Sequence, residues 1–291
     1  MNTDVFSSYQ DVRLPQGPLR IYRAGPREAL SVVLLHGAML DTAAFTWHHL
    51  APVLARDRDV VAVDMPRHGG SRPWTGLLDQ ARMEAVLDEV LDHLGISRAV
   101  LVGLSMGGGI ATGYALSRPE RVAGLVAINP GGLDDERPLQ LLTWLALRSS
   151  TLLRWASRWM VSPWLLRRSM ARTFVHGEHT RDFAVLMRMV EAEARRRAEH
   201  GDPALDDWQV AAYGPRRMVL NHTPGLRRLQ VPSLWVHGRK DTLVSQAVVR
   251  RAAESAPGAR WVEVDDAGHL APLDEPEAVG GAIVSFLDGL G

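Results

Sequence analysis

The sequence predicts an α/β protein built on a mostly parallel, eight-stranded sheet flanked by helices, with a helical insertion late in the chain. Short apolar runs, typical of strands buried on both faces, alternate with amphipathic helical stretches as far as residue 133. Helical patterns with almost no strand signal then begin at residue 134, and the alternation resumes near residue 224. We therefore divide the chain into a core, residues 1–133 and 224–291, and an insertion, residues 134–223.

The core elements follow one another in the order that a mostly parallel sheet requires. Residues 5–14 and 19–24 show short extended patterns, so we expect two antiparallel strands ahead of the parallel ones. The next expected elements are a strand at 32–35, a helix at 43–55, a strand at 60–64, a helix at 77–94, a strand at 99–104, a helix at 106–117 and a strand at 122–128. After the insertion we expect a strand at 231–238, a helix at 245–255, a strand at 260–264 and a closing helix from residue 276.

The composition excludes several classes of protein. The 291 residues contain 33 Lys and Arg against 33 Asp and Glu, so no overall charge attracts a nucleic acid. Cysteine is absent, which excludes disulfides, thiol nucleophiles and cysteine-bound metals. Because the N-terminal segment lacks a continuous apolar stretch and no later segment is long and apolar enough to span a bilayer, we expect a soluble, cytoplasmic protein without stable membrane insertion.

Ser105 lies in the most informative stretch of the chain, Gly103-Leu104-Ser105-Met106-Gly107. It stands between an expected buried strand and an expected helix, which is typical of a nucleophile elbow that exposes a strained serine above a sheet. The glycines two residues before and after it allow the strand and the helix to approach closely. An ordinary helix N-cap serine is the alternative, but a cap does not require these glycines. We therefore expect Ser105 to be a nucleophile.

A reactive serine needs a base to take its proton and an acid to orient that base. The chain supplies Asp241 after the strand at 231–238 and His269 after the strand at 260–264, in the order serine, acid, histidine. Both residues follow the carboxyl ends of expected parallel strands, and ligand sites of open sheets form at that edge. We expect His269 to be the base and Asp241 the acid.

Three other carboxylates compete with Asp241 for the role of acid. Asp265 and Asp266 are nearer to His269 in sequence, although a solvated turn accounts for both. Asp64 also ends a parallel strand, but it lies in a motif of its own and is expected to brace loops by hydrogen bonding.

The remaining histidines indicate structural roles rather than a metal site. His36 is expected to be a structural residue beside the end of its strand. The pair His48-His49 has no carboxylate or histidine at ligand spacing, and His176 with His179 gives only a weak pair. We therefore expect neither a metal nor a cofactor.

These motifs resemble those of the α/β-hydrolase superfamily over nearly the whole chain outside the insertion. The matching segments are LHGA at 35–38, DMPRHGGS at 64–71, GLSMGG at 103–108, the acid loop at Asp241 and the Gly268-His269 pair. The resemblance implies an α/β-hydrolase fold and an oxyanion hole formed by the backbone N–H groups of Ala38 and Met106, with Ala38 preferred over Met39 on the family pattern. The chain departs from that pattern at Arg67, where the family often has glycine.

The insertion is expected to be a lid over the site. Residues 139–145 and 152–159 are amphipathic, with apolar residues and arginine on different sides. Five tryptophans lie in the insertion: Trp144, Trp155, Trp159, Trp164 and Trp208. A helix lying on a membrane surface is the alternative, but an apolar lid also provides a wall for an acyl or aryl group.

The constellation and the resemblance together predict a serine hydrolase without cofactor that cleaves a small or medium hydrophobic carboxylic ester through an acyl-enzyme. One alternative is a carbon–carbon bond hydrolase of aromatic ring-fission products. The segments 105–108 and 129–133 are similar to that subfamily, although it commonly has Trp after the histidine, where this chain has Leu270. A haloperoxidase-like perhydrolase and a non-catalytic ligand-binding member of the fold are further alternatives.

Overall fold

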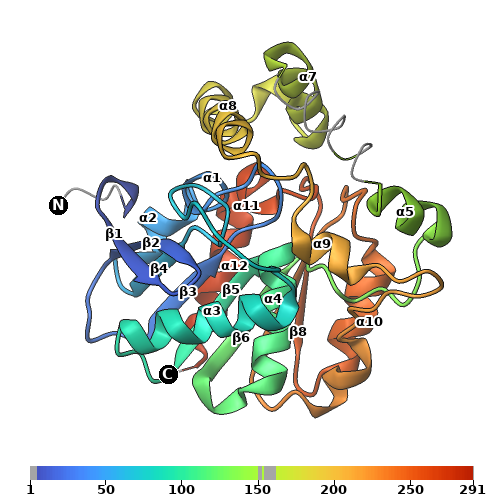
Figure 1. The fold of residues 1–291 in the computed structure, drawn as a ribbon. Coiled ribbons are helices and arrows are strands. Elements are labelled where there is room, and N and C mark those ends of the chain that lie inside the picture. Colours follow the sequence, from blue (N-terminus) through green and yellow to red (C-terminus); the bar gives the residue numbers. More distant parts are fainter. Residues whose placement is uncertain (1–4, 150–152, 154–161, 291) are drawn as a thin grey trace.

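Eight strands form one sheet in the computed structural model, which describes residues 5–149, 153 and 162–290. The strands are β1 (Tyr9–Leu14), β2 (Gly17–Ala24), β3 (Ser31–Leu35), β4 (Asp59–Val63), β5 (Ala99–Leu104), β6 (Val122–Ile128), β7 (Ser233–Gly238) and β8 (Arg260–Val264). Their order across the sheet is β1-β2-β4-β3-β5-β6-β7-β8 (Figure 1). Strands β1 and β2 pair antiparallel, as does β2 with β4, whereas every pair from β4 to β8 is parallel. The predicted mostly parallel α/β sheet is confirmed.

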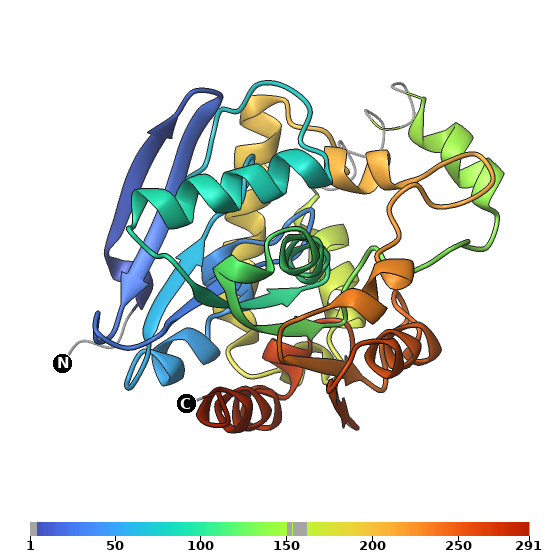
Figure 2. The ribbon, with the colours of Figure 1, turned by 90° about the horizontal axis from the view of Figure 1, so that it is seen from below.

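Helices cover both faces of the sheet (Figure 2). One face carries α3 (Gln80–His93), α4 (Met106–Ser117) and α10 (Gln246–Ser255), and the other carries α1 (Ala43–Thr46), α2 (Leu50–Leu54), α11 (Ala271–Asp274) and α12 (Pro276–Asp288). Short 3₁₀ helices lie at Val5–Ser7, Pro119–Arg121, Gly177–His179 and Thr223–Arg228.

The central parallel strands are buried on both faces, as their uninterrupted apolar runs predict. Along β3, Val33 and Leu35 belong to the apolar cluster under α3 and α4, whereas Val32 and Leu34 belong to the cluster under α2 and α12. All four side chains are fully buried. The alternation follows from the two-residue period of a strand, and it keeps the carboxyl ends of the parallel strands at one rigid edge.

Two expected helices differ from the prediction, each for a local reason. The expected helix at 43–55 is two short helices separated by a turn at residues 47–49. Pro52 explains the break, because its ring clashes with the carbonyl of the residue four positions earlier, which lies in that turn. The helix expected from residue 77 begins at Gln80, since the Asp79 side chain caps it by accepting a 2.9 Å hydrogen bond from the Arg82 N–H.

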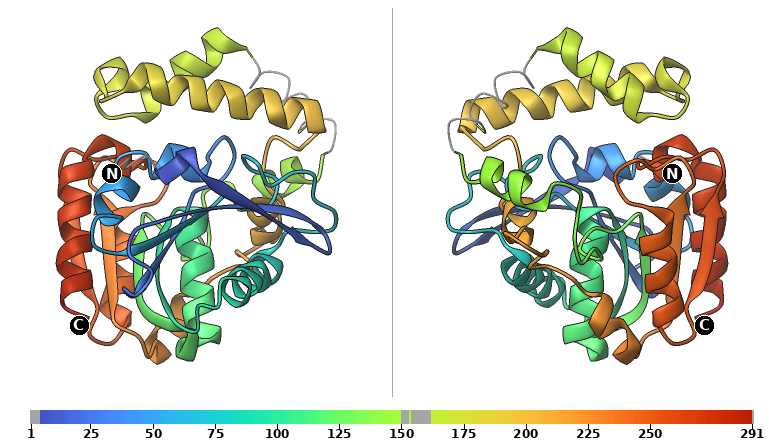
Figure 3. Two further views of the ribbon diagram at one scale, coloured as in Figure 1. Left: turned by 90° about the vertical axis from the view of Figure 1, so that its left-hand side faces the viewer. Right: turned by 90° about the vertical axis from the view of Figure 1, so that its right-hand side faces the viewer.

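The insertion contains four described helices: α5 (Gln140–Leu147), α7 (Pro163–Thr173), α8 (Phe183–His200) and α9 (Asp207–Ala212). Figures 1 and 3 show α7 and α8 together as a layer above the sheet. Trp155 and Trp159 lie outside the described residues. Trp208 is buried in the core, where its indole donates a 2.6 Å hydrogen bond to Gln80, so α9 packs with the core helices rather than with α7 and α8. None of the described helices is long and apolar enough to cross a membrane.

Buried charged side chains attach α8 to the core. Glu193, 1 % exposed, accepts a 2.5 Å hydrogen bond from Arg72 and a 3.1 Å hydrogen bond from the Gly69 N–H. One turn later, Arg197 donates a 2.6 Å hydrogen bond to the carbonyl of the core residue Met39, and it pairs with Asp206, in the segment after α8, at 2.9 Å. Because an unpaired buried charge is costly, these pairs fix where α8 docks even where they add little net stability.

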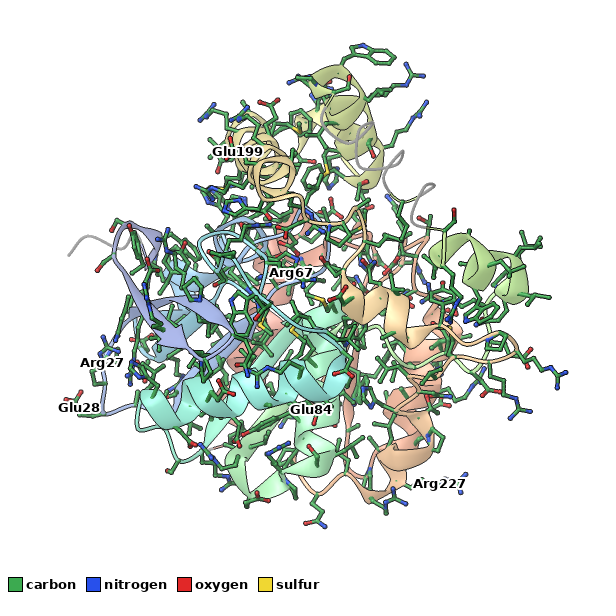
Figure 4. All side chains as sticks on the ribbon, in the orientation of Figure 1. Arg27, Glu28, Arg67, Glu84, Glu199 and Arg227 are labelled. Atoms are coloured by element: carbon green, nitrogen blue, oxygen red, sulfur yellow. The ribbon has the colours of Figure 1, made fainter. Side chains whose placement is uncertain are left out.

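Arg67 makes a further connection between the core and the insertion. Its backbone is left-handed, with φ of 62°, the conformation that glycine adopts most easily. Its side chain bonds to Asp207, the first residue of α9, at 2.7 Å, and to the carbonyl of Gly76. Figure 4 labels Arg67 near the middle of the molecule, below α8.

We predict that Gly107→Ala lowers the free energy of unfolding by at least about 3 kcal/mol. A Cβ there would lie 2.3 Å from the Leu35 carbonyl oxygen, and the contacted atoms are backbone atoms that cannot move aside. Gly281→Ala is the control, because Gly281 lies in α12 with no atom within 4 Å of a new Cβ. The control should gain about 0.5–1 kcal/mol by helix propensity. Denaturant unfolding of the two variants checks this, and equal stabilities would contradict it.

Candidate active site

Ser105 occupies a strained turn between β5 and α4. Its φ of 52° and ψ of −113° are rare for a residue with a side chain. A Cβ at Gly103 would lie 2.3 Å from the Gly107 carbonyl oxygen, so the flanking glycines permit the close approach of strand and helix. Ser105 stands at the N-cap position of α4, yet its side chain makes no capping hydrogen bond. The hydroxyl is therefore not used as a helix cap.

His269 and Asp241 are brought together from two neighbouring loops. The Nδ1 atom of His269 lies 2.8 Å from Oδ2 of Asp241, whose side chain is fully buried. The other carboxylate oxygen accepts the N–H groups of Leu243 and Val244, at 2.7 and 3.1 Å. Burial disfavours the charge of Asp241, but the His269 hydrogen bond and these N–H groups hold its pKa below the usual value. An ionised Asp241 fixes the tautomer of His269 with the proton on Nδ1.

Two buried polar side chains hold the His269 loop, and sequence reasoning did not identify either of them. Asn129 donates hydrogen bonds from its side-chain amide to the carbonyls of Gly268 and His269, at 2.9 and 3.0 Å. Its amide oxygen accepts the N–H of Gly238 at the end of β7. Asp274 accepts the Gly268 N–H at 2.9 Å. Asn129 follows a predicted strand, which could have marked it, whereas nothing in the sequence marks Asp274.

The other carboxylates have different partners. Asp265 and Asp266 are exposed and pair with Arg239 and Lys240, both at 2.8 Å. Asp64 is buried and accepts the N–H groups of Ala43 and Gly70 and the Tyr22 hydroxyl. Asp64 thus braces two loops, as its position at the strand end predicts.

The loop after β3, residues 36–41, passes beside Ser105. A Cβ on Gly37 would lie 3.6 Å from the Ser105 Cβ. Within the described residues, the N–H groups of Ala38 and Met106 have no hydrogen-bond acceptor, whereas the Met39 N–H donates to Asp206 at 2.6 Å. Two free N–H groups therefore lie in the segments next to the serine, one in the loop after β3 and the other at the N-terminus of α4.

His36 and His68, both fully buried, stack edge to face 4.8 Å apart and have opposite protonation states. His36 donates from Nδ1 to the Gly37 carbonyl at 2.7 Å and accepts the Met65 N–H at Nε2, so it is neutral. Burial and the neighbouring His68 charge hold the pKa of His36 well below 6.5. His68 faces the Pro66 carbonyl and the Asp206 carboxylate, both acceptors, so it is charged. Although burial opposes the charge, Asp206 raises the pKa of His68.

A cavity of about 1210 Å³ lies between the carboxyl edge of the sheet and the insertion. Ser105, His269 and Ala38 line it on the core side. Most of the opposite wall comes from α7 and the residues after it, including Leu166, Met170 and Phe174. Trp164 also lines the cavity and is 65 % exposed. Helix α5 does not line it, and its residues Leu141, Leu142 and Leu145 are more than half exposed.

One group of side chains in the described part of the chain has a spacing that could hold a metal ion. The structure brings Asp182, from the start of α8, to the His48-His49 pair, with nitrogen-to-oxygen distances of 3.9 Å to each ring. Sequence spacing did not reveal this carboxylate, because it lies 133 residues beyond His49. His176 is paired with Glu275 at 3.1 Å.

Comparison with known proteins identifies the family. A family model described as alpha/beta hydrolase fold matches residues 31–276. The chain belongs to the α/β-hydrolase fold family. The crystal structure of carboxylesterase CesB (YbfK) from Bacillus subtilis matches this hydrolase with a TM-score of 0.76 at 24% identity, covering 97% of this chain and 92% of that one.

Sequence relatives of this hydrolase differ in their named activities. It is 27% identical over 281 residues to carboxylesterase YbfK of Bacillus subtilis (strain 168), covering 94% of this chain and 85% of the relative. It is 28% identical over 265 residues to the 2-hydroxy-6-oxononadienedioate/2-hydroxy-6-oxononatrienedioate hydrolase of Cupriavidus pinatubonensis. The match covers 89% of this chain and 87% of the relative. A 30% match to the dihydrolipoyllysine-residue acetyltransferase component of the acetoin cleaving system of Pseudomonas putida covers 92% of this chain and 66% of that protein.

We predict that the pKa values of the two stacked histidines of this hydrolase are shifted in opposite directions from 6.5, downward for His36 and upward for His68. ¹⁵N NMR of the imidazole nitrogens at pH 7 should show His36 neutral with its proton on Nδ1 and His68 protonated on both nitrogens. His36 should stay neutral well below pH 6.5, and His68 should stay charged above it. A His68→Gln variant assigns the signals. Two rings that both titrate near pH 6.5 would contradict the prediction.

Proposed function

We propose that this protein is a serine hydrolase that cleaves carboxylic esters, with Ser105 as nucleophile, His269 as base and Asp241 as the acid that orients it. The observation that carries the proposal is the strained Ser105 on the wall of a cavity that is also lined by His269, itself hydrogen-bonded to buried Asp241. Strain of this kind persists where function requires it. The free N–H groups of Ala38 and Met106 provide the oxyanion hole.

The chemistry is acyl transfer to water. His269 Nε2 takes the Ser105 proton as Oγ attacks the ester carbonyl, and the negative oxygen of the tetrahedral intermediate binds the two N–H groups. The alcohol leaves with the proton from His269, and an acyl-enzyme remains. Water then attacks the acyl-enzyme with His269 again as base, which releases the acid and restores the Ser105 hydroxyl. Asp241 stabilises the imidazolium in both halves.

The substrate we propose is small to medium in size with a hydrophobic acyl or alcohol part. The cavity is much larger than an acetyl group, and Leu40, Phe45 and Leu270 extend its apolar lining on the core side. An apolar lining of this kind favours the binding of apolar substrates, because binding removes their apolar surface from water. We propose that α7, which provides most of the opposite wall, acts as part of a lid.

A second candidate is hydrolysis of a carbon–carbon bond in a ring-fission product. It is favoured by the relative named for an oxononadienedioate and by residues 129–133, NPGGL, which resemble that subfamily. In the structure Asn129 supports the His269 loop, a role that an ester hydrolase needs equally. Leu270, in place of the tryptophan common in that subfamily, favours the esterase.

We predict that Asp241→Asn lowers kcat on a p-nitrophenyl ester by about 10⁴-fold, because asparagine keeps the shape but favours the wrong imidazole tautomer. Ser105→Ala should remove turnover altogether without unfolding the protein. Asp265→Asn is the control, since that exposed carboxylate pairs with Arg239, and its kcat should stay within about tenfold of the wild type. Melting temperatures are measured alongside. A folded Asp241→Asn enzyme with wild-type kcat, or an inactive Asp265→Asn, would refute the assignment.

We predict that kcat/KM on p-nitrophenyl esters rises by about fourfold per methylene from acetate upward, as each methylene enters the apolar cavity. A dienone ring-fission product is assayed beside the esters. The esterase assignment predicts slower turnover of the dienone than of the best ester. The opposite order, with the dienone preferred by more than about tenfold, supports the second candidate.

A further inference from the structure

We propose that Arg197 and Asp206 are positioning residues that hold the oxyanion loop, residues 36–41, in the shape that leaves the Ala38 N–H free. The inference rests on the proposed function, because this N–H matters only if an oxyanion forms beside Ser105. Helix α8, which carries Arg197, would then affect the stabilisation of the transition state by holding the oxyanion loop, although the helix itself does not contact the reacting atoms.

Core side chains fix the first half of the loop. The Gly37 N–H donates to buried Asp41 at 2.7 Å. The Gly37 carbonyl accepts a 2.7 Å hydrogen bond from His36 Nδ1. Because the C=O and N–H of a trans peptide point in opposite directions, this bond turns the Ala38 N–H away from His36. That N–H is the one in the loop segment 37–39 without an acceptor among the described residues.

Side chains of the insertion fix the second half. The Met39 N–H donates to Asp206 Oδ2 at 2.6 Å, and the Met39 carbonyl accepts from Arg197 Nη1 at 2.6 Å. Met39 has a φ of 68°, a left-handed conformation that is uncommon for a residue with a long side chain. A conformation of this kind persists where its surroundings hold it. Arg197 and Asp206 grip Met39 on both its N–H and its carbonyl.

The clamp formed by Arg197 and Asp206 is buried, and its two charges pair with each other. Arg197 is 4 % and Asp206 6 % exposed. Arg197 Nη2 bonds to the Pro203 carbonyl at 2.5 Å and to Asp206 Oδ1 at 2.9 Å, so the guanidinium serves three acceptors in all. Asp206 Oδ2 also faces charged His68 at 3.2 Å. The planar, forked guanidinium suits several fixed acceptors, which a lysine ammonium cannot reach together.

The chain offers a matched neighbour for comparison. Glu193 lies one turn before Arg197 on α8, is 1 % exposed and also pairs with a core residue, Arg72. Its hydrogen bonds lead to the loop at residues 69–72 and not to the oxyanion loop. Loss of either pair would weaken the docking of α8, whereas loss of Arg197, but not of Glu193, would also change the geometry of the oxyanion loop.

The test compares Arg197→Lys and Arg197→Met with the control Glu193→Gln. Four quantities are measured: kcat and KM on p-nitrophenyl butyrate, the rate of Ser105 labelling by a fluorophosphonate, the affinity for a trifluoromethyl ketone, and Tm. The ketone forms a tetrahedral adduct whose oxygen occupies the oxyanion hole, so its affinity reports on the hole rather than on substrate binding.

We expect Arg197→Lys to lower kcat by about 10- to 100-fold with KM within about threefold, and ketone affinity to fall in step with kcat, since one full oxyanion donor is worth about 100- to 1000-fold. Arg197→Met should lose more. The kcat of Glu193→Gln should stay within about threefold of the wild type, even if its Tm falls as far as that of Arg197→Lys. If Arg197→Met does not fold, Asp206→Asn replaces it beside Arg197→Lys.

Equal kcat losses for Arg197→Lys and Glu193→Gln would overturn the proposal, as would a loss confined to KM or an unchanged ketone affinity. Failure of the proposed function is a separate result. If Ser105 is not the nucleophile, the fluorophosphonate will not label the wild type at Ser105 at all. If only the positioning role is wrong, wild type and Arg197→Lys will be labelled at equal rates.

Discussion

The left-handed turn at Ser105 is the constraint on which the rest of the site depends. Ser105 turns with a φ of 52° where β5 and α4 meet closely, and only glycine fits at 103 and 107, because a Cβ added at either position would lie 2.3 Å from a backbone carbonyl oxygen. The turn raises the serine above the sheet and leaves the Met106 N–H free at a helix start. The loop after β3 and the His269 loop are then arranged around that fixed point by hydrogen bonds to buried side chains.

The insertion is attached to the core by buried ion pairs and hydrogen bonds of charged side chains as well as by apolar contacts. The buried Arg72–Glu193 ion pair joins a core loop to α8. Arg197 of α8 pairs with Asp206 in the segment after that helix and donates a hydrogen bond to the carbonyl of Met39 in another core loop. Replacing such pairs by apolar residues is often neutral for stability, so their physical effect is to specify one docked arrangement. Each charge is satisfied only when α8 lies in its observed place, and the strained Met39 backbone is held in that same arrangement.

Much of the core could be predicted because its signals are local. Runs of apolar residues predict the buried strands, and the two flanking glycines predict the sharp turn at Ser105. Where the helix at 43–55 proved to be two, the cause, Pro52, was also local and visible in the sequence. Asn129 and Asp274 could not be assigned in this way, because their role is to hold the backbone of the His269 loop, and Asn129 lies 140 residues from His269.

The sequence by itself determined the order of strands and helices, the strained serine and the expected order of acid and histidine, since periodicity, turn chemistry and motif spacing act over a few residues. The tertiary structure decided which polar groups meet. In the folded chain His269 pairs with Asp241. Asp265 and Asp266, which are nearer to His269 in sequence, pair with Arg239 and Lys240 instead. The tertiary structure also joined Met39 to Asp206 across 167 positions. A polar group takes its partner from whatever groups the folded chain brings within about 3 Å, and distance along the sequence does not limit that choice.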